Sequence, residues 1–198
     1  METIRKPRQQ RAIIKFDKIV ESGFKLICKS GYYNINTKEI AKEAGVSTGI
    51  IYQYFNDKHD ILMSGLEKYG DAIFFPILAN NNIDIKFKNF KELLNKMIDN
   101  YINNHKISAV AHEELMAMVH LDKDVAAYYY QREIKMTDTI KSILQNNNFD
   151  DENLEEKVHI MINLIDDLCH EIIYHKHDDM NYDIMKNLVV DTIINLFN

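Results

Sequence analysis

Features that are missing from this sequence already narrow its fold. Its 198 residues include only two prolines, Pro7 and Pro76, so little in the chain opposes long helices. Strand-like alternation of apolar and polar residues does not extend over useful lengths, and we find no internal repeat. No apolar run reaches the roughly 20 residues that a membrane span needs. We therefore expect an all-α protein, large enough for one or two domains, with no membrane partner.

Cysteine is also scarce. Cys28 and Cys169 lie far apart on apolar helical faces, so we interpret them as reduced core thiols and not as a disulfide. Residues 1–11 are charged and no apolar segment follows them, which gives no sign of a signal peptide. The sequence therefore predicts a cytoplasmic protein.

Charge is unevenly distributed along the chain. The net charge of −6 argues against a nucleic-acid partner when it is taken alone. Residues 1–65, however, hold eleven Lys and Arg against seven Asp and Glu, whereas residues 66–198 hold thirteen against twenty-three. A basic head on an acidic body suggests that the head alone meets phosphate. The N-terminal arm adds Arg5, Lys6, Arg8 and Arg11, which either track a DNA backbone or form a solubilising tail.

The apolar periodicity predicts about nine helices. Two short helices fall between residues 36 and 55. The longer ones are expected over residues 11–30, 58–75, 89–104, 108–120, 122–145, 151–175 and 183–198.

The most informative segment is the pair of short helices. Asn36 and Glu39 have the spacing of a capping box. Gly45 is expected to end the first helix in a left-handed conformation. Ser47 or Thr48 begins a second helix, in which at least Ile50, of Ile50 and Ile51, should face the core. This pattern predicts a helix-turn-helix, a motif that places its second helix in the DNA major groove.

These residues resemble the DNA-binding signature of the tetracycline-repressor (TetR) family of bacterial transcriptional regulators. Two departures are mild: Ile51 is more usually Leu, and Ser22-Gly23 stands where small apolar residues are common. The matching residues are Gly31, Tyr32, Thr37, Ile40, Ala41, Ala44, Gly45, Val46, Ser47, Gly49, Tyr52, Tyr54, Phe55, Lys58, Ile61 and Leu62.

The resemblance implies a DNA-binding domain over residues 1–56 and a helical regulatory and dimerisation domain over residues 57–198. By analogy with family positions, Thr48, Gly49, Ile51 and Gln53 would meet base edges. Thr37, Lys38, Tyr52, Tyr54 and Lys58 would hold phosphates. A lysine at the start of a helix is electrostatically unfavourable, so Lys58 also suggested a nearby anion such as phosphate.

The last two helices carry a wide apolar seam with heptad-like spacing. The resemblance implies that this seam pairs with a second subunit, although a buried helix pair in a monomer has the same pattern. The residues expected at a homodimer interface are Met161, Ile165, Leu168, Ile172, Leu188, Val189, Ile193 and Leu196. A twofold dimer would face a palindromic operator.

The family commonly binds a small effector inside each subunit. Aromatic and methionine side chains would suit an apolar or amphipathic effector, although such residues are more often plain core. The candidates are Phe75, Phe90, Met97, Tyr101, Met116, Tyr128 and Met161.

Other functional classes have weaker support. No two histidines among His105, His112 and His120, or among His170, His175 and His177, stand at the i, i+4 spacing of a helical metal site, so no metal or other cofactor is expected. No catalytic motif is present, which argues against an enzyme.

The sequence therefore predicts a DNA-binding transcriptional regulator, most simply a repressor released by a small molecule. An effector-independent adaptor or architectural protein on the same fold is the alternative.

Overall fold

The computed structural model describes residues 7–75, 77, 85–104, 107–149 and 152–198, and over these residues it is helical with no strand. Helices α4, η1 and α5 follow one another without a break, so the described residues form nine helices when these three are taken as one. The elements are α1 (Gln10–Ser30), α2 (Thr37–Ala44), α3 (Thr48–Ile51), α4 (Lys58–Gly65), the π-helix η1 (Leu66–Gly70), α5 (Asp71–Phe74), α7 (Phe90–Asn104), α8 (Ala109–Leu121), α9 (Lys123–Gln145), α10 (Leu154–Tyr174) and α11 (Tyr182–Leu196).

The all-α prediction is confirmed, and the predicted ends of the seven longer helices lie within three residues of the observed ones. Pro76 lies outside the described residues. None of the helices in the described part of the chain has the combination of length and apolarity needed to cross a membrane.

The chain divides into two compact units. The first comprises residues 1–71 and 106–130, and the second comprises residues 72–105 and 131–198. Helix α8 therefore belongs to the same compact unit as the predicted helix-turn-helix, although about fifty residues separate them in sequence. The functional boundary at residues 56 and 57 remains a prediction.

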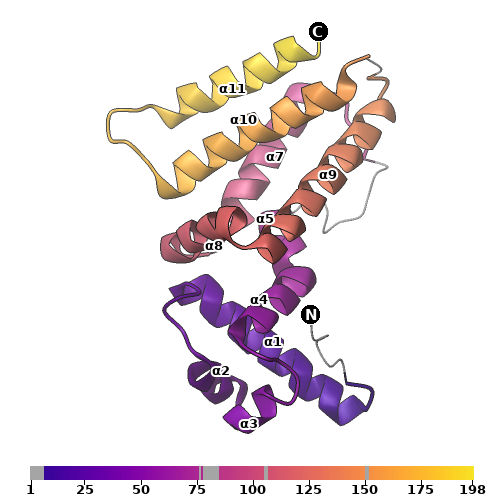
Figure 1. The fold of residues 1–198 in the computed structure, drawn as a ribbon. Helices are drawn as coiled ribbons and strands as arrows, with labels where there is room; N and C mark the ends of the chain where they lie inside the picture. Colours follow the sequence, from indigo (N-terminus) through magenta and orange to yellow (C-terminus); the bar gives the residue numbers. More distant parts are fainter. Residues whose placement is uncertain (1–6, 76, 78–84, 105–106, 150–151) are drawn as a thin grey trace. The chain divides into compact units, whose positions relative to one another are not determined.

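In the first unit, α1 packs against α2, α4 and α8 (Figure 1). The core side chains Ile19, Ile27, Ile40 and Phe55 have at most 1% of their surface exposed. Helix α4 approaches α1 closely at Gly65, because a Cβ there would collide with the ring of Phe24. These contacts fix the short helices α2 and α3 to the longer α1 and α4.

In the second unit, α10 packs against α11 and α7, and α11 also contacts α7 (Figure 1). This arrangement corrects the predicted dimer seam. Met161, Ile165, Leu168 and Ile193 are between 0 and 6% exposed and form the core of their own chain. Apolar residues have the same spacing on a helix that packs within its own subunit and on one that packs against a partner. The sequence pattern therefore does not distinguish core residues from interface residues.

Some apolar side chains of α10 and α11 are exposed to solvent. The most exposed of these are Ile160, Ile184 and Leu188, at 46%, 58% and 63% of their surface. Of the other residues predicted at the interface, Ile172, Val189 and Leu196 are half-buried.

Each compact unit contains one cysteine, and both are buried and free, as expected. Burial raises the pKa of the Cys28 thiol and that of the Cys169 thiol to about 12 in each case. Both thiols are therefore protonated at neutral pH.

Candidate nucleic-acid interface

The first helix of the motif is fixed at both ends by the residues that the sequence indicated. The Asn36 side chain accepts hydrogen bonds from the backbone N–H groups of Lys38 and Glu39, at 3.0 and 3.1 Å, and the Glu39 carboxylate accepts one from Asn36 N at 2.9 Å. This is the predicted capping box. At the other end Gly45 has φ 65°, a left-handed conformation that a side chain would strain. The turn into α3 is thereby defined.

Helix α3 is shorter than expected and presents Ile51 to the core. It covers Thr48–Ile51, and single hydrogen-bonded turns continue to Phe55. Ile51 is 0% exposed, whereas Ile50 is half-buried. Ile50 thus faces the core only in part, and the prediction that Ile51 touches a base is wrong for this structure. A fully covered side chain offers no surface to a base edge.

The other three predicted base-contacting residues have accessible surface. Gly49 and Gln53 are exposed, and Thr48 is half-buried. A Cβ built on Gly49 would have only Ser47 Oγ near it, at 3.9 Å. The packing of the fold therefore does not require a glycine at position 49. Glycine also lowers helix stability by about 1 kcal/mol relative to alanine, so the fold gains nothing from it.

Two of the predicted phosphate-contacting residues are hydrogen-bonded to each other. The hydroxyl groups of Thr37, on α2, and Tyr52, after α3, lie 3.1 Å apart, and the Tyr52 side chain is 58% exposed. Lys38 is exposed. Tyr54 is half-buried, with its ring edge-on to Phe16 at 6.0 Å. The Thr37–Tyr52 pair thus joins the two helices at an accessible surface.

Lys58 has a different environment from the one that its position suggested. Its ammonium donates to the carbonyl oxygens of Tyr32, at 2.7 Å, and Ile35, at 2.9 Å, and lies 4.3 Å from the centroid of the Tyr32 ring. Burial lowers the pKa of the Lys58 ammonium, although the carboxylates of Glu114 and Glu39 oppose the shift. The two backbone carbonyls explain how a lysine is accommodated at the start of α4.

Basic side chains of α1 extend the surface beside the motif. Arg8 and Arg11 are exposed, and Arg5 and Lys6 of the predicted arm lie outside the described residues. Lys15 and Lys18, which sequence reasoning missed, are also exposed, and Lys18 Nζ lies near the Gly45 turn. Their spacing along α1 was visible in the sequence, but only the fold places Lys18 next to the turn.

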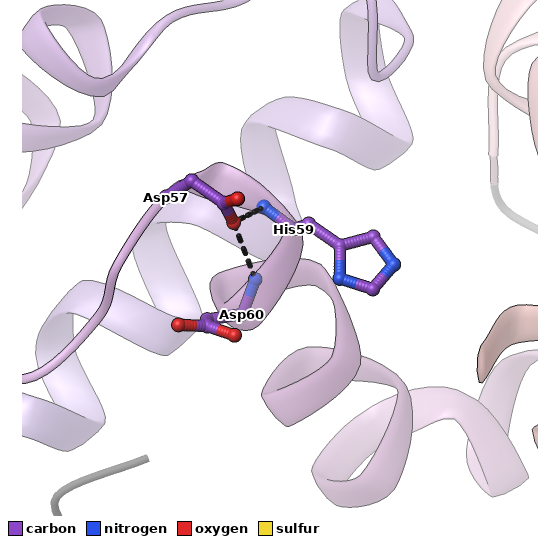
Figure 2. A group of neighbouring side chains, drawn as sticks. All are labelled: Asp57, His59 and Asp60. Atoms are coloured by element: carbon purple, nitrogen blue, oxygen red, sulfur yellow. Dashed lines mark hydrogen bonds between the residues drawn. The ribbon is translucent and has the colours of Figure 1, made fainter. Parts of the chain in front are cut away.

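One group of side chains has the composition of a metal site but serves as helix caps. Figure 2 shows the Asp57 carboxylate accepting from His59 N and Asp60 N, at 2.8 and 3.1 Å, and a ring nitrogen of His59 lies within 4.8 Å of an oxygen of each carboxylate. The ring also contacts Asp122, with 3.0 Å between His59 Nε2 and Asp122 Oδ2. Asp122 in turn accepts from the N–H groups at the start of α9. The side chains of this group are therefore explained by their structural roles: Asp57 caps α4, Asp122 caps α9, and His59 contacts Asp122.

The predicted effector residues are divided between the compact units. Met116 and Tyr128 belong to the first, where the buried Tyr128 hydroxyl donates to Leu66 O of the π-helix at 2.9 Å. Phe75, Phe90, Met97, Tyr101 and Met161 belong to the second. There the Phe90 ring stacks on Phe87, is tilted against Phe149 and meets Phe197 edge-on.

The second unit also contains a polar group that the sequence did not indicate. The Tyr101 hydroxyl lies 2.9 Å from Asp166 Oδ1, to which it donates, and 2.9 Å from His170 Nε2. It places hydrogen-bonding groups among the mainly apolar side chains of α7 and α10.

Comparisons with known proteins agree with the geometry of α1–α4. Residues 19–63 match the family model described as bacterial regulatory proteins, tetR family. The HTH-type transcriptional regulator HbdR of Aromatoleum sp. (strain CIB) is 48% identical over 54 residues, which are 27% of this chain and 24% of that protein. The aligned stretch thus spans about a quarter of this relative.

Solved structures share the fold over nearly the whole chain. A proposed TetR-family regulator from Mesorhizobium loti has a TM-score of 0.72 at 13% identity, with 95% of this chain and 97% of that one covered. A proposed transcriptional regulator from Saccharomonospora viridis, solved in complex with choline, has a TM-score of 0.71 at 21% identity, with 94% and 97% covered. The family match at residues 19–63 and the shared all-helical fold together support the TetR family of bacterial regulatory proteins.

Proposed function

We propose that this chain is a cytoplasmic, sequence-specific DNA-binding repressor, with DNA contacts in residues 1–56 and regulation in residues 57–198. The observation that carries the proposal is the accessible surface where the Thr37–Tyr52 pair lies on the same short motif as Gly49 and Gln53. Thr48, Gly49 and Gln53 would contact base edges, and Thr37, Lys38, Tyr52 and Tyr54 would contact phosphates. Arg8 and Arg11 would extend the phosphate contacts.

Selection of random duplex DNA by the purified chain tests this proposal. We expect enrichment of a palindrome with half-sites about one helical turn apart. Gln53→Ala should relax the base preference at one position of each half-site. Lys38→Ala should weaken binding to all sequences equally, and should reduce the slope of log affinity against log salt concentration (the salt slope) by about 1. Salt-sensitive binding without any enriched sequence would contradict the proposal.

We further propose that two chains associate through α10 and α11, where Ile160, Ile184 and Leu188 are exposed. Large apolar side chains left open to solvent favour association. Sedimentation should give a dimer, and Leu188→Glu should convert it to a monomer. The control is Leu121→Glu, which introduces the same charge at a leucine that is 83% exposed in the other unit. Monomeric wild-type protein would contradict this part.

We propose a small effector bound in the second unit, where Tyr101, Asp166 and His170 would supply polar contacts. The choline complex of one structural neighbour makes small organic cations the first class to test. Addition of choline or a related quaternary amine should raise the melting temperature and release the selected duplex. Duplex affinity unchanged by a broad panel would favour an effector-independent adaptor.

A further inference from the structure

The loop between α1 and α2 is held from both sides by charged side chains of other helices. Lys58, on α4, donates to two carbonyl oxygens of the loop, those of Tyr32 and Ile35. Glu114, on α8, accepts from Tyr33 N at 2.9 Å and from the Asn34 side-chain amide at 3.3 Å. The ammonium thus satisfies acceptors of the loop and the carboxylate satisfies donors. Hydrogen bonds to charged groups are stronger than neutral ones.

Gly31 allows the carboxylate to approach the loop this closely. Its φ is 90°, and a Cβ at this position would lie 2.6 Å from Glu114 Oε2. A side chain there would therefore be strained by its backbone conformation and would also displace Glu114. The Glu114 carboxylate thus packs directly on Gly31, although the two residues lie in the two separate sequence segments that make up the first unit.

Two further contacts hold the ends of α8 to the same unit. Ser108 N, at its start, donates to Cys28 O at 2.8 Å. Asp122, at its end, lies 3.0 Å from His59 at the start of α4. Helix α8 is thus held at its beginning, middle and end by residues of the first unit. We therefore expect α8 and the helix-turn-helix to move together.

The loop leads directly to the surface proposed to meet DNA. It ends at Asn36, which caps α2, and the next residue is Thr37, which pairs with Tyr52. A shift of the loop would therefore move the first turn of α2 and the Thr37–Tyr52 pair together.

We propose that Glu114 is a positioning residue for DNA binding, which acts through the α1–α2 loop and makes α8 part of the DNA-reading unit. This proposal rests on the proposed function. It assigns a role to a residue outside the 19–63 segment that matches the family model. It also gives Lys58 the complementary role on the other side of the loop.

The test compares three variants in their affinity for the selected duplex, measured well below the melting temperature. Glu114→Ala should bind about tenfold more weakly, because it removes acceptors to which two loop groups donate. Glu114→Gln keeps an acceptor oxygen and should fall between Glu114→Ala and the wild type. The control, Glu67→Ala, removes an exposed carboxylate from the same unit and should bind equally or more tightly, since it only makes the chain more positive.

Two additional measurements separate positioning from general stability. The Tyr33 amide should exchange its hydrogen faster in Glu114→Ala and Glu114→Gln, but not in Glu67→Ala. The salt slope should stay at the wild-type value, because no phosphate contact is lost. Equal affinities of Glu114→Ala and Glu67→Ala, or unchanged Tyr33 exchange, would overturn the proposal. Failure of the wild type to select any duplex would refute the proposed function, and Tyr33 exchange would still decide whether Glu114 holds the loop.

Discussion

The α2–α3 segment and the α10–α11 pair are stabilised in different ways. Helix α2 has eight residues, and the Asn36–Glu39 box and Gly45 define its two ends. Helix α10 has twenty-one residues, begins without a side-chain cap and is held by one face of apolar residues. Short helices depend on end signals because few residues contribute to packing, whereas long helices depend on the apolar face.

This difference decides what each segment reveals in its sequence. End signals identify individual residues and their partners, so the capping box and the turn were predicted correctly. An apolar face identifies a set of residues without saying what covers them. The predicted dimer residues Met161, Ile165, Leu168 and Ile193 proved to be core for that reason.

The largest expected effect tests the core of the second unit. Ile193→Ala should lower the free energy of unfolding by about 2–5 kcal/mol, because Ile193 is fully buried. Leu188→Ala should leave the unfolding of a dilute sample almost unchanged and should weaken self-association only. Urea denaturation at two protein concentrations measures both. If Leu188→Ala lowered the free energy of unfolding of dilute protein more than Ile193→Ala does, Leu188 would be the core residue and Ile193 the exposed one.

A similar effect is expected for the buried isoleucine of α3. Ile51→Ala should cost about 2–5 kcal/mol and Ile50→Ala clearly less, because only Ile51 is fully covered. Urea denaturation followed by circular dichroism compares the two variants. The opposite order would show that Ile50, and not Ile51, is the core residue.

The capping box should contribute less than either core residue. Asn36→Ala should cost about 1 kcal/mol, because it leaves two N–H groups of α2 without their acceptor. Gln9→Ala is the control, since Gln9 occupies the same position before α1 but makes no capping hydrogen bond with its side chain. Equal effects of the two substitutions on the urea midpoint would mean that end signals do not fix α2.

The contribution of Asp122 should depend on pH. Burial raises the pKa of its carboxyl, but hydrogen bonds from Val125 N and Asp124 N and the contact with His59 together hold that pKa below its usual 3.8. The resulting stabilisation is present above the unfolded pKa and is lost as the pH falls through the lower folded value. Asp122→Asn should therefore cost up to about 1 kcal/mol at pH 7 and progressively less below pH 4. A cost that stays constant down to pH 3, in urea titrations at several pH values, would exclude this account.

The smallest effect on stability is expected at Gly49. Gly49→Ala should stabilise the fold by up to about 1 kcal/mol, because the site has room for a Cβ and alanine favours helix. It should nevertheless weaken binding of the selected duplex if bases approach the backbone there. Melting temperature and duplex affinity, measured on the same sample, should therefore change in opposite directions. Tighter binding would remove Gly49 from the proposed interface.

Local chemistry therefore made much of the fold and part of the interface predictable. Asn36 and Gly45 act within a few residues of themselves, so their roles could be predicted from the sequence. The roles of Lys58 and Glu114 were not, because each meets groups that are distant in sequence: Lys58 binds carbonyls 23 and 26 residues away, and Glu114 binds donors 80 and 81 residues away. Periodicity also left open how far Ile51 is buried in α3, since a single helical turn is too short to define a face.

The two buried thiols allow opening of each unit to be followed separately. A thiol reagent attacks the thiolate, so with pKa values of about 12 and little exposed surface, Cys28 and Cys169 should react only when their surroundings open. Because each unit holds one of them, peptide mapping after a labelling pulse reports how often each unit opens in the native protein. Equal labelling rates would indicate one cooperative opening event, and unequal rates would rank the two units by local stability.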